Sequence, residues 1–304
     1  MSREAVIQVR RLVKHYEAVR AVDGIDLSIH EGEVFALLGP NGAGKTTTVE
    51  ILEGHRRRAT GEVRVLGFDP QTGGRPFRER IGIVLQSSGF ERELSVREVL
   101  GVYRPMYPRP RSVEEVIELV GLGAKADTRV KALSGGQQRR LDLALGLIGD
   151  PDLLFLDEPT TGFDPSARRR AWELVDDLRS LGKTILLTTH YMDEAQHLAD
   201  RVAVMAGGRI VAEGTPASLV GGETATQISF RLPAGTSVGE LPRLEGEVEV
   251  HGESVQLSTR RATQTLHALT SWATERGVEL EGLTVLRPSL EEVYLELTGR
   301  EGDG

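Results

Sequence analysis

The sequence lacks several features that define large classes of protein. It has no cysteine among its 304 residues, which excludes disulfides, thiolate nucleophiles and cysteine-ligated metals. No stretch approaches the ~18 consecutive apolar residues of a membrane span. Basic residues (37) are outnumbered by acidic ones (45), and this net charge of −8 disfavours general nucleic-acid binding. The seven histidines lack metal-ligand spacing, so no zinc site is expected. Because Met1–Glu4 has no secretory-signal layout, we expect a cytoplasmic chain that reaches a membrane only through another protein.

The length and the distribution of charge indicate two domains. At roughly 150 residues per domain, this length corresponds to about two. Residues 221–304 carry 14 acidic and 7 basic side chains, net −7, whereas residues 1–220 carry only −1. The Gly221-Gly222 pair follows a turn-like Gly214–Pro216, and such clusters mark loops. We therefore place a boundary near residue 220.

Short apolar runs alternate with helical patterns in the first domain. Strands buried on both faces are predicted over Val34–Leu38, Leu153–Leu156 and Ile185–Leu187. Strands that alternate with helices imply a mostly parallel α/β sheet with right-handed crossovers. One helix is predicted to begin at Lys45, and two more over Ala167–Leu181 and Met192–Ala199. Residues 93–126 are predicted to be mainly helical, with an extended break at Pro105, Pro108 and Pro110.

The second domain has a less regular pattern. Strands are predicted over Ile228–Leu232, Glu247–Leu257 and Leu283–Leu286, and helices over Ala262–Arg276 and Ser289–Leu297. This mixture predicts a small α+β domain.

Residues 39–46 read GPNGAGKT and match the phosphate-binding pattern G-x-x-x-x-G-K-[ST] between a predicted strand and a predicted helix. Gly42 and Gly44 keep Cβ atoms out of the way of phosphate oxygens, and the helix N-terminus adds partial positive charge. Lys45 can bridge the β- and γ-phosphates, and the Thr46 hydroxyl can ligate Mg²⁺. The loop therefore predicts a nucleotide site. Its candidate binding residues are Gly39, Pro40, Asn41, Gly42, Ala43, Gly44, Lys45, Thr46 and Thr47.

Two adjacent carboxylates, Asp157 and Glu158, follow the apolar run Leu153–Leu156. The carboxyl ends of strands are where α/β sheets place ligands. Asp157 would hold Mg²⁺, and Glu158 would be the general base for an attacking water. The alternative is that the pair caps the next helix. Together with the phosphate loop (residues 39–46), the pair predicts nucleotide hydrolysis.

The segment Leu133–Gln137 reads LSGGQ. On propensity alone it is a helix start capped by Ser134, with glycines that let an anion approach closely. In this order, about 90 residues after the phosphate loop, the five residues are specific to one family. The chain resembles the nucleotide-binding subunit of an ABC transporter over at least residues 5–219. The resemblance implies that Ser134, Gly135, Gly136 and Gln137 contact ATP.

The same resemblance assigns roles to four further residues. Tyr16 matches the aromatic that stacks on adenine, with simple packing as the alternative. Gln86 matches the glutamine that senses Mg²⁺ and the membrane partner. Asp164 matches a loop that crosses to the opposite subunit, although Phe163 replaces the expected leucine. His190 matches the histidine that contacts the γ-phosphate. The implied catalytic residues are Glu158, His190, Lys45 and Gln86, and the implied Mg²⁺ ligands are Thr46, Gln86 and Asp157.

The family resemblance also implies a site shared by two subunits. They pack head to tail, with ATP between the phosphate loop of one and LSGGQ of the other. Because the chain holds one complete set of motifs, we expect a homodimer or a pairing with a related chain. The implied fold is a P-loop NTPase domain (residues 1–220) with a mostly parallel sheet, an antiparallel β subdomain and a helical subdomain at about 87–140. A small acidic accessory or regulatory domain follows over residues 221–304.

A narrower resemblance covers the whole chain. Residues 156–216 and the tail Pro288–Leu295 are similar to the ATP-binding subunits of bacterial drug-resistance exporters of the daunorubicin type. This implies an ATPase that powers export of a hydrophobic small molecule, a drug, antibiotic or lipid-like compound. It would act through a separate polytopic permease, at the cytoplasmic face of the plasma membrane.

Two other functions stay open at this point. One is a soluble ABC ATPase with no transport role, such as cofactor assembly. Members in translation usually carry two ATPase units, and repair members insert coiled coils or zinc modules, for which the 46 residues between Gln86 and Leu133 leave no room. The other is an ATP-binding regulator, which intact Glu158 and His190 disfavour. The acidic second domain either binds a partner or regulates the dimer, or is a solubilising accessory that helps hold it.

Overall fold

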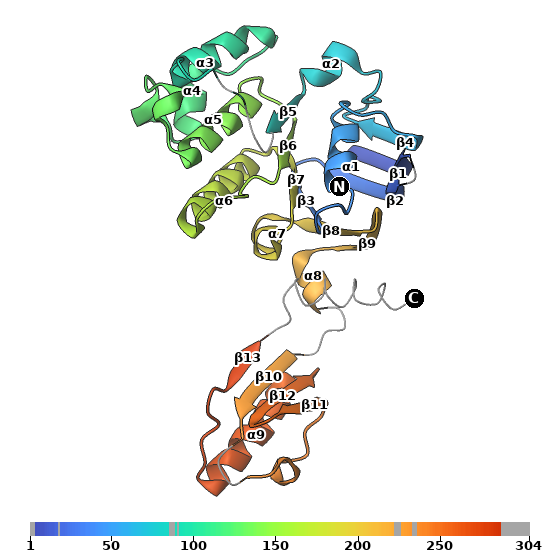
Figure 1. Ribbon diagram of the computed structural model, residues 1–304, viewed down its shortest axis with the longest axis vertical. Helices are drawn as coiled ribbons and strands as arrows, with labels where there is room; N and C mark the ends of the chain where they lie inside the picture. The colour runs from blue at the N-terminus through green and yellow to red at the C-terminus, as the bar shows by residue number, and fades with distance from the viewer. Residues whose placement is uncertain are drawn as a thin grey trace. The chain divides into compact units, whose positions relative to one another are not determined.

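The computed structural model describes residues 4–17, 19–84, 89, 91–221, 226–232 and 236–286 (Figure 1). The chain divides into two compact units, Met1–Pro216 and Ala217–Gly304. The predicted helix at Ser289–Leu297 and the tail segment Pro288–Leu295 lie outside the described residues. Within the described segments, no helix is long and apolar enough to cross a membrane.

A six-stranded sheet with the order β5-β6-β7-β3-β8-β9 forms the centre of the first unit. Neighbouring strands run parallel from β5 to β8, and β9 is antiparallel to β8. All five residues of β3 are buried, as expected for a strand covered on both faces. The six strands are β3 (Val34–Leu38), β5 (Ile81–Val84), β6 (Leu153–Asp157), β7 (Thr184–Thr189), β8 (Arg201–Ala206) and β9 (Arg209–Gly214).

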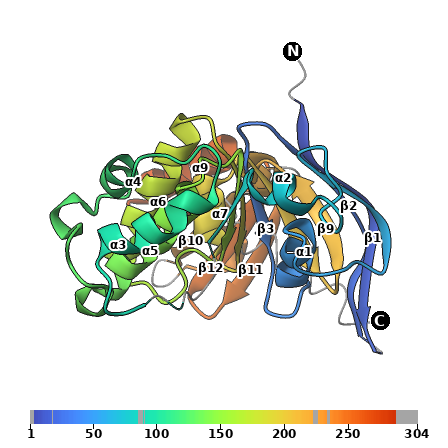
Figure 2. The same ribbon diagram turned by 90° about the horizontal axis from the view of Figure 1, so that it is seen from above.

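A second, antiparallel sheet has the order β2-β1-β4 and contains β1 (Ala5–Tyr16), β2 (Val19–His30) and β4 (Thr60–Val65). Helix α1 (Lys45–Leu52) lies between this sheet and the six-stranded one (Figure 2). One hydrophobic core joins all three elements. Burial of this shared core holds the two sheets and α1 together as one body. Its members include Ile7, Val63, Phe35, Leu52 and Phe155.

The other face of the six-stranded sheet is covered by helices (Figure 2). Ser95 and Ser112 cap α3 and α4, each accepting a hydrogen bond from a backbone N–H in the first turn. Pro105 lies in a 3-10 turn, Arg104–Met106, that follows α3, and two further 3-10 turns of this unit are Gly123–Lys125 and Val130–Ala132. The helices are α3 (Val96–Tyr103), α4 (Val113–Leu119), α5 (Gly135–Leu147), α6 (Pro165–Ser180) and α7 (Met192–Leu198), and the short α2 (Gly74–Arg78) precedes β5.

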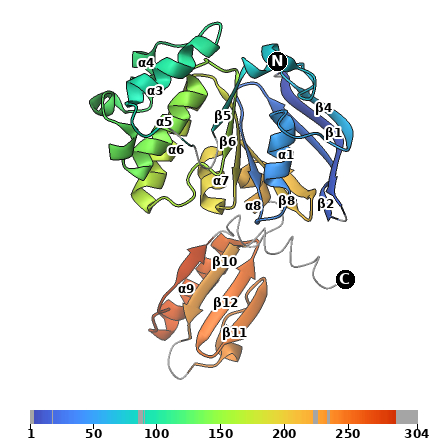
Figure 3. The same ribbon diagram turned by 45° about the horizontal axis from the view of Figure 1, so that its top comes forward.

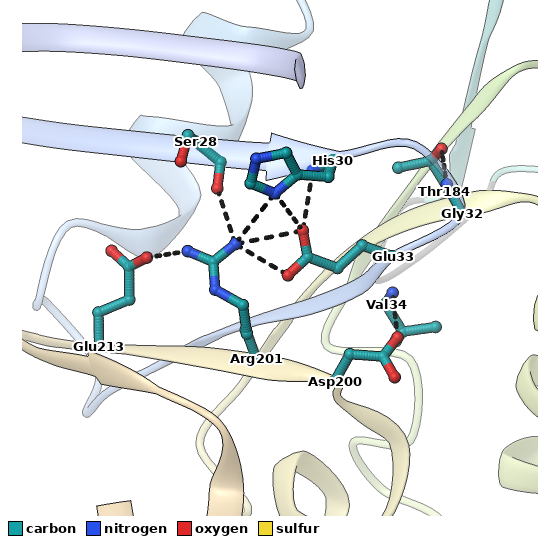
Figure 4. Close-up of polar contacts among 9 residues, drawn as sticks. All are labelled: Ser28, His30, Gly32, Glu33, Val34, Thr184, Asp200, Arg201 and Glu213. Carbon is teal, nitrogen blue, oxygen red and sulfur yellow. Dashed lines mark hydrogen bonds and ion pairs between the residues drawn. The ribbon is translucent and has the colours of Figure 1, made fainter. Parts of the chain in front are cut away.

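An arginine of β8 ties the two sheets together (Figure 4). The guanidinium of Arg201 donates from Nη1 to the carbonyl oxygen of Ser28 at 3.2 Å and to Glu33 Oε1 at 2.9 Å. Its Nη2 pairs with Glu213 of β9. Glu33 is buried, and its carboxylate also accepts the backbone N–H of His30 at 2.8 Å. This network fixes the chain where β2 turns into β3, the strand that leads into the phosphate loop.

The second unit is a four-stranded antiparallel sheet with the order β11-β12-β10-β13. Helix α9 (Ala262–Arg276) packs on one face (Figure 3), where its Leu269 joins Ile228, Phe230 and Leu257 in the core. The other elements are α8 (Pro216–Gly221), the 3-10 turn Val238–Glu240, β10 (Thr226–Arg231), β11 (Glu247–His251), β12 (Ser254–Thr259) and β13 (Thr284–Leu286).

The predicted fold class is confirmed by this architecture. The mostly parallel sheet, the antiparallel β subdomain, the helical subdomain and the small α+β unit are all present.

Candidate functional site

The phosphate loop connects the buried strand β3 to α1, which begins at Lys45. Two of its glycines have left-handed backbones, with φ of +84° at Gly42 and +101° at Gly44. A Cβ at Gly44 would lie 2.2 Å from the carbonyl oxygen of Ala21 in β2, whereas one at Gly42 would meet open space. Gly44 is therefore required by close packing on a neighbouring strand as well as by its φ, which the sequence pattern did not indicate.

The ammonium group of Lys45 is held inside this loop. The residue is only 5% exposed, and its Nζ donates to the carbonyl oxygens of Gly39 at 2.6 Å and Pro40 at 3.1 Å. Burial lowers the pKa of Lys45, and the negative charges of Glu158 and Asp157 oppose that shift. The positive charge of Lys45 is therefore close enough to Asp157 and Glu158 to interact with both carboxylates.

Glu158 follows the last residue of β6, and its carboxylate meets groups from two other segments. Its Oε1 lies 3.9 Å from Lys45 Nζ and 3.3 Å from His190 Nδ1. Its Oε2 accepts a hydrogen bond from the Thr161 hydroxyl at 3.0 Å. The structure therefore brings together three of the predicted catalytic residues, from the start of α1 and from just beyond the ends of β6 and β7. This is the carboxyl edge of a parallel sheet, where α/β proteins bind ligands.

Thr188 of β7 orders the acidic pair. Its hydroxyl donates to Asp157 Oδ1 and accepts the backbone N–H of Glu158 at 3.0 Å. The sequence motifs do not include Thr188 or Thr161. The sequence gives only their positions: Thr188 follows the apolar run Ile185–Leu187, and Thr161 follows the acidic pair by three positions, which does not identify their partners.

His190 follows β7 directly, and its imidazole ring lies 4.1 Å from the ring of Tyr191. The residue before it, Thr189, accepts the backbone N–H of Gly39 at 3.3 Å. The backbone that carries the histidine is therefore hydrogen-bonded to the start of the phosphate loop.

The LSGGQ segment forms the start of α5. Ser134 is the N-cap, accepting the backbone N–H of Gln137 at 3.3 Å, while Gln137 Oε1 accepts the N–H of Ser134 at 3.0 Å. Helices α5 and α1 lie on opposite sides of the six-stranded sheet in Figures 1 and 2. Within one chain, α5 and α1 therefore do not share a face of this sheet.

Asp164 caps α6 by accepting the backbone N–H groups of Ser166 and Ala167, both at 2.9 Å. The alternative that Asp157 and Glu158 cap this helix is therefore wrong.

Tyr16 ends β1, and its ring is partly exposed. Lys14 Nζ lies 5.0 Å and Arg56 Cζ 5.2 Å from the ring centroid, so two cations flank the aromatic face. Tyr16 is 37% exposed rather than packed in the core, which argues against the simple-packing alternative. The predicted residue Gln86 lies outside the described residues.

Comparisons with known proteins identify the family. The chain is 40% identical to the daunorubicin/doxorubicin resistance ATP-binding protein DrrA of Streptomyces peucetius, covering 98% of this chain and 93% of the relative. The chain belongs to the ABC transporter ATP-binding family. It is also 40% identical to the Nod factor export ATP-binding protein I of Neorhizobium galegae, over 97% of this chain and 85% of that one. The model of the family "ABC transporter" matches residues 22–161. A model for the C-terminal domain of ABC transporter domain-containing-like proteins matches residues 226–289.

Solved structures agree with the ABC assignment. An ATP-binding cassette of an ABC transporter in its ADP conformation, MJ1267, aligns with a TM-score of 0.63 at 25% identity, covering 70% of this chain and 91% of that one. The ATP-binding subunit of an ABC transporter aligns at 0.66 over 96% of this chain and 99% of that one; at 21% identity it supports the fold alone. The predicted family and the predicted ATPase activity coupled to transport are thus confirmed.

Proposed function

We propose that this ABC ATPase powers export of a hydrophobic small molecule through a separate polytopic membrane subunit at the cytoplasmic face of the plasma membrane. The observation that carries the chemistry is the convergence of Lys45 and His190 on the carboxylate of Glu158. The names of the two relatives, a drug-resistance protein and a Nod factor export protein, support a role in export.

In this proposal the phosphate loop binds the triphosphate of ATP. Backbone N–H groups of Gly42 and Gly44 and of the first turn of α1, which begins at Lys45, face the β- and γ-phosphates, because a helix N-terminus carries partial positive charge. Lys45 exchanges its carbonyl partners for phosphate oxygens, a stronger pairing since both partners are charged. Tyr16 stacks on the adenine, and its exposed ring is available for this contact.

Hydrolysis then uses Glu158 as the general base. Its carboxylate takes a proton from a water as the water oxygen bonds to the γ-phosphorus. The bond from that phosphorus to the β–γ bridging oxygen breaks, and ADP leaves with the electron pair. His190 contacts the γ-phosphate and fixes the water between that phosphate and Glu158.

The residues present suit Mg²⁺. Asp157 and Thr46 supply the hard oxygen atoms that this ion prefers, and Gln86 is the third proposed ligand. Among the described residues no group of three or more histidine or acidic side chains could hold a metal. Mg²⁺ binds through one or two carboxylates and completes its shell with neutral oxygen atoms, phosphate and water, and Asp157 is the one carboxylate proposed here. When bound, Mg²⁺ supplies positive charge to the β- and γ-phosphate oxygens.

The complete site is proposed to need a second copy of the chain, packed head to tail. Ser134, Gly135, Gly136 and Gln137 of one subunit would cover the γ-phosphate on the other, and Asp164 would lie at the subunit boundary. Two observations support this arrangement: α5 and α1 are separated by the sheet within one chain, and a related cassette bound to ADP and phosphate is a dimer. We assign ATP binding to residues 1–220 and an accessory or regulatory role to residues 221–304.

A capture experiment tests the transport role. The tagged Glu158→Gln chain is incubated with ATP and detergent-solubilised membranes of its native host, and bound proteins are identified by mass spectrometry. A polytopic membrane protein with about six apolar spans of ~20 residues supports the proposal. The soluble fraction is the matched control. Recovery of cofactor-assembly proteins, ribosomes or nucleic acid alone would leave the ATPase chemistry intact and refute the transporter role.

A further inference from the structure

Helix α5, which begins in the LSGGQ segment, carries a buried arginine that contacts the end of β6. Arg139 is only 7% exposed. Its Nε donates to the carbonyl oxygen of Pro159 at 3.2 Å, and its Nη2 donates to the carbonyl oxygen of Asp157 at 3.2 Å. One planar guanidinium therefore binds the carbonyl groups on both sides of Glu158.

The surroundings of Arg139 are acidic. Its Nη1 lies 3.7 Å from Asp142 Oδ2, one turn further along α5. Burial lowers the pKa of Arg139, and the nearby Asp142, Asp157 and Glu194 oppose that shift. Guanidinium stays protonated in proteins, so its donors make charge-assisted hydrogen bonds to the two carbonyls, which are stronger than neutral ones.

Glu158 has a backbone conformation that needs such support. Its φ is +45°, in the left-handed region that residues with a Cβ rarely adopt. Such a backbone is strained and persists only where its surroundings hold it. Here Thr188 accepts the N–H of Glu158, and Arg139 binds the carbonyls of the two neighbouring residues. The turn directs the carboxylate toward His190 and Lys45.

We propose that Arg139 is a positioning residue for ATP hydrolysis: its guanidinium holds the turn at Glu158 so that the carboxylate faces the phosphate loop. This inference rests on the proposed role of Glu158 as general base. Arg139 acts through the backbone, whereas ATP binding depends on residues 39–47. Loss of its contacts therefore lowers the rate of hydrolysis and leaves ATP affinity nearly unchanged.

The purified full chain allows a direct test with Arg139→Met and Arg139→Lys. We expect kcat to fall by ~10–100-fold in Arg139→Met, because small misplacements of a catalytic group have effects of that size, and KM to stay within about 2-fold. Arg139→Lys keeps the buried charge but loses the planar fork, and it should recover part of the rate. The matched control is Arg140→Met. Arg140 is the next residue of α5 and also donates to two carbonyls, those of Val120 and Gly121, away from Glu158.

A double-mutant cycle separates positioning from general destabilisation. In a Glu158→Gln background, Arg139→Lys should cause little further loss, because the group that it positions is already inactive. The inference would be overturned if Arg139→Lys lowered kcat by the same factor in the wild-type and Glu158→Gln proteins. It would also be overturned if both Arg139 variants kept the wild-type kcat. If Arg139→Met does not fold by circular dichroism, Arg139→Lys alone decides. Wild-type hydrolysis by Glu158→Gln would instead refute the proposed function, whatever Arg139 does.

Discussion

Lys45 Nζ lies 3.9 Å from Glu158 Oε1, so the cation of the phosphate loop and the carboxylate that follows β6 face each other across the edge of the sheet. Each group is mostly buried, with side-chain exposures of 5% and 14%. This ion pair places the Lys45 ammonium group, which would bind the triphosphate, next to the Glu158 carboxylate, which would accept a proton from water.

Removing the cation should prevent tight nucleotide binding. In Lys45→Ala the charged contact to the phosphates is lost, and we expect ATP to bind at least ~10–100-fold more weakly, since a charge-assisted hydrogen bond is worth about 1.5–3 kcal/mol. Isothermal titration calorimetry measures the change. Lys183→Ala is the matched control, because Lys183 also pairs with a carbonyl and a carboxylate, those of Pro151 and Asp150, away from the phosphate loop. Unchanged affinity in Lys45→Ala would contradict the assignment of the loop.

Replacing the carboxylate should separate binding from hydrolysis. In Glu158→Gln the side-chain shape remains but the proton acceptor is lost, so kcat should fall by about 10²–10⁴-fold while ATP still binds. Phosphate release and nucleotide affinity, measured on the same preparation, give the two values. Hydrolysis near the wild-type rate would exclude Glu158 as the base.

A mixing experiment tests the shared site. Ser134→Arg places a large cation at the start of α5, and Lys45→Ala disables the phosphate loop, so neither homodimer should hydrolyse ATP. Random mixing gives half heterodimers, each with one intact site, and should restore about a quarter of wild-type activity. Full activity of Ser134→Arg alone would rule out the head-to-tail site.

A buried glutamate just after α1 should make stability depend on pH. Burial, with smaller contributions from Asp157 and Glu50, raises the pKa of Glu53 to about 8. The folded protein therefore holds this proton over a range, about pH 4.5 to 8, in which the unfolded chain has lost it. The stability contributed by the protonated carboxyl is complete below that range and is lost as pH rises through it, at up to about 1.4 kcal/mol per pH unit.

The Glu53→Gln variant serves as the comparison, because its amide side chain does not titrate. Urea unfolding of the nucleotide-free, EDTA-treated protein at pH 5 and pH 8 should show a smaller loss of stability in Glu53→Gln than in wild type, by a few kcal/mol. Identical pH dependence in the two proteins would mean that Glu53 ionises normally in the folded state.

Local patterns were sufficient to predict part of the fold. The buried strand β3, the start of α1 at Lys45 and the helix α9 at Ala262–Arg276 all follow from short-range apolar spacing or from the phosphate-binding pattern. The antiparallel sheet of β1, β2 and β4 came only from the family resemblance. In this sheet β1 pairs with β4, although β3 and α1 lie between them in the sequence. No short stretch of sequence therefore indicates the pairing.

The contacts that shape the site were outside the reach of sequence reasoning for a similar reason. Thr188 and Arg139 support the turn at Glu158 from β7 and α5, which are distant from it in the sequence. The residues adjacent to Thr188 and Arg139 in the sequence do not indicate that they contact this turn. The left-handed backbone of Glu158 depends on these contacts, so it too required the structure.

The order of strands also affects when the nucleotide site can fold during synthesis of the chain. The strand that leads into the phosphate loop, β3, pairs with β7 and β8, which come from residues 184–206, whereas β1 and β2 are consecutive and pair with each other. Long-range parallel pairing is slow, because the intervening chain must be closed into a loop first. A nascent chain that ends before β7 therefore carries the whole Gly39–Thr46 motif without the strands that support it, and nucleotide binding should begin only after residue 206 has left the ribosome.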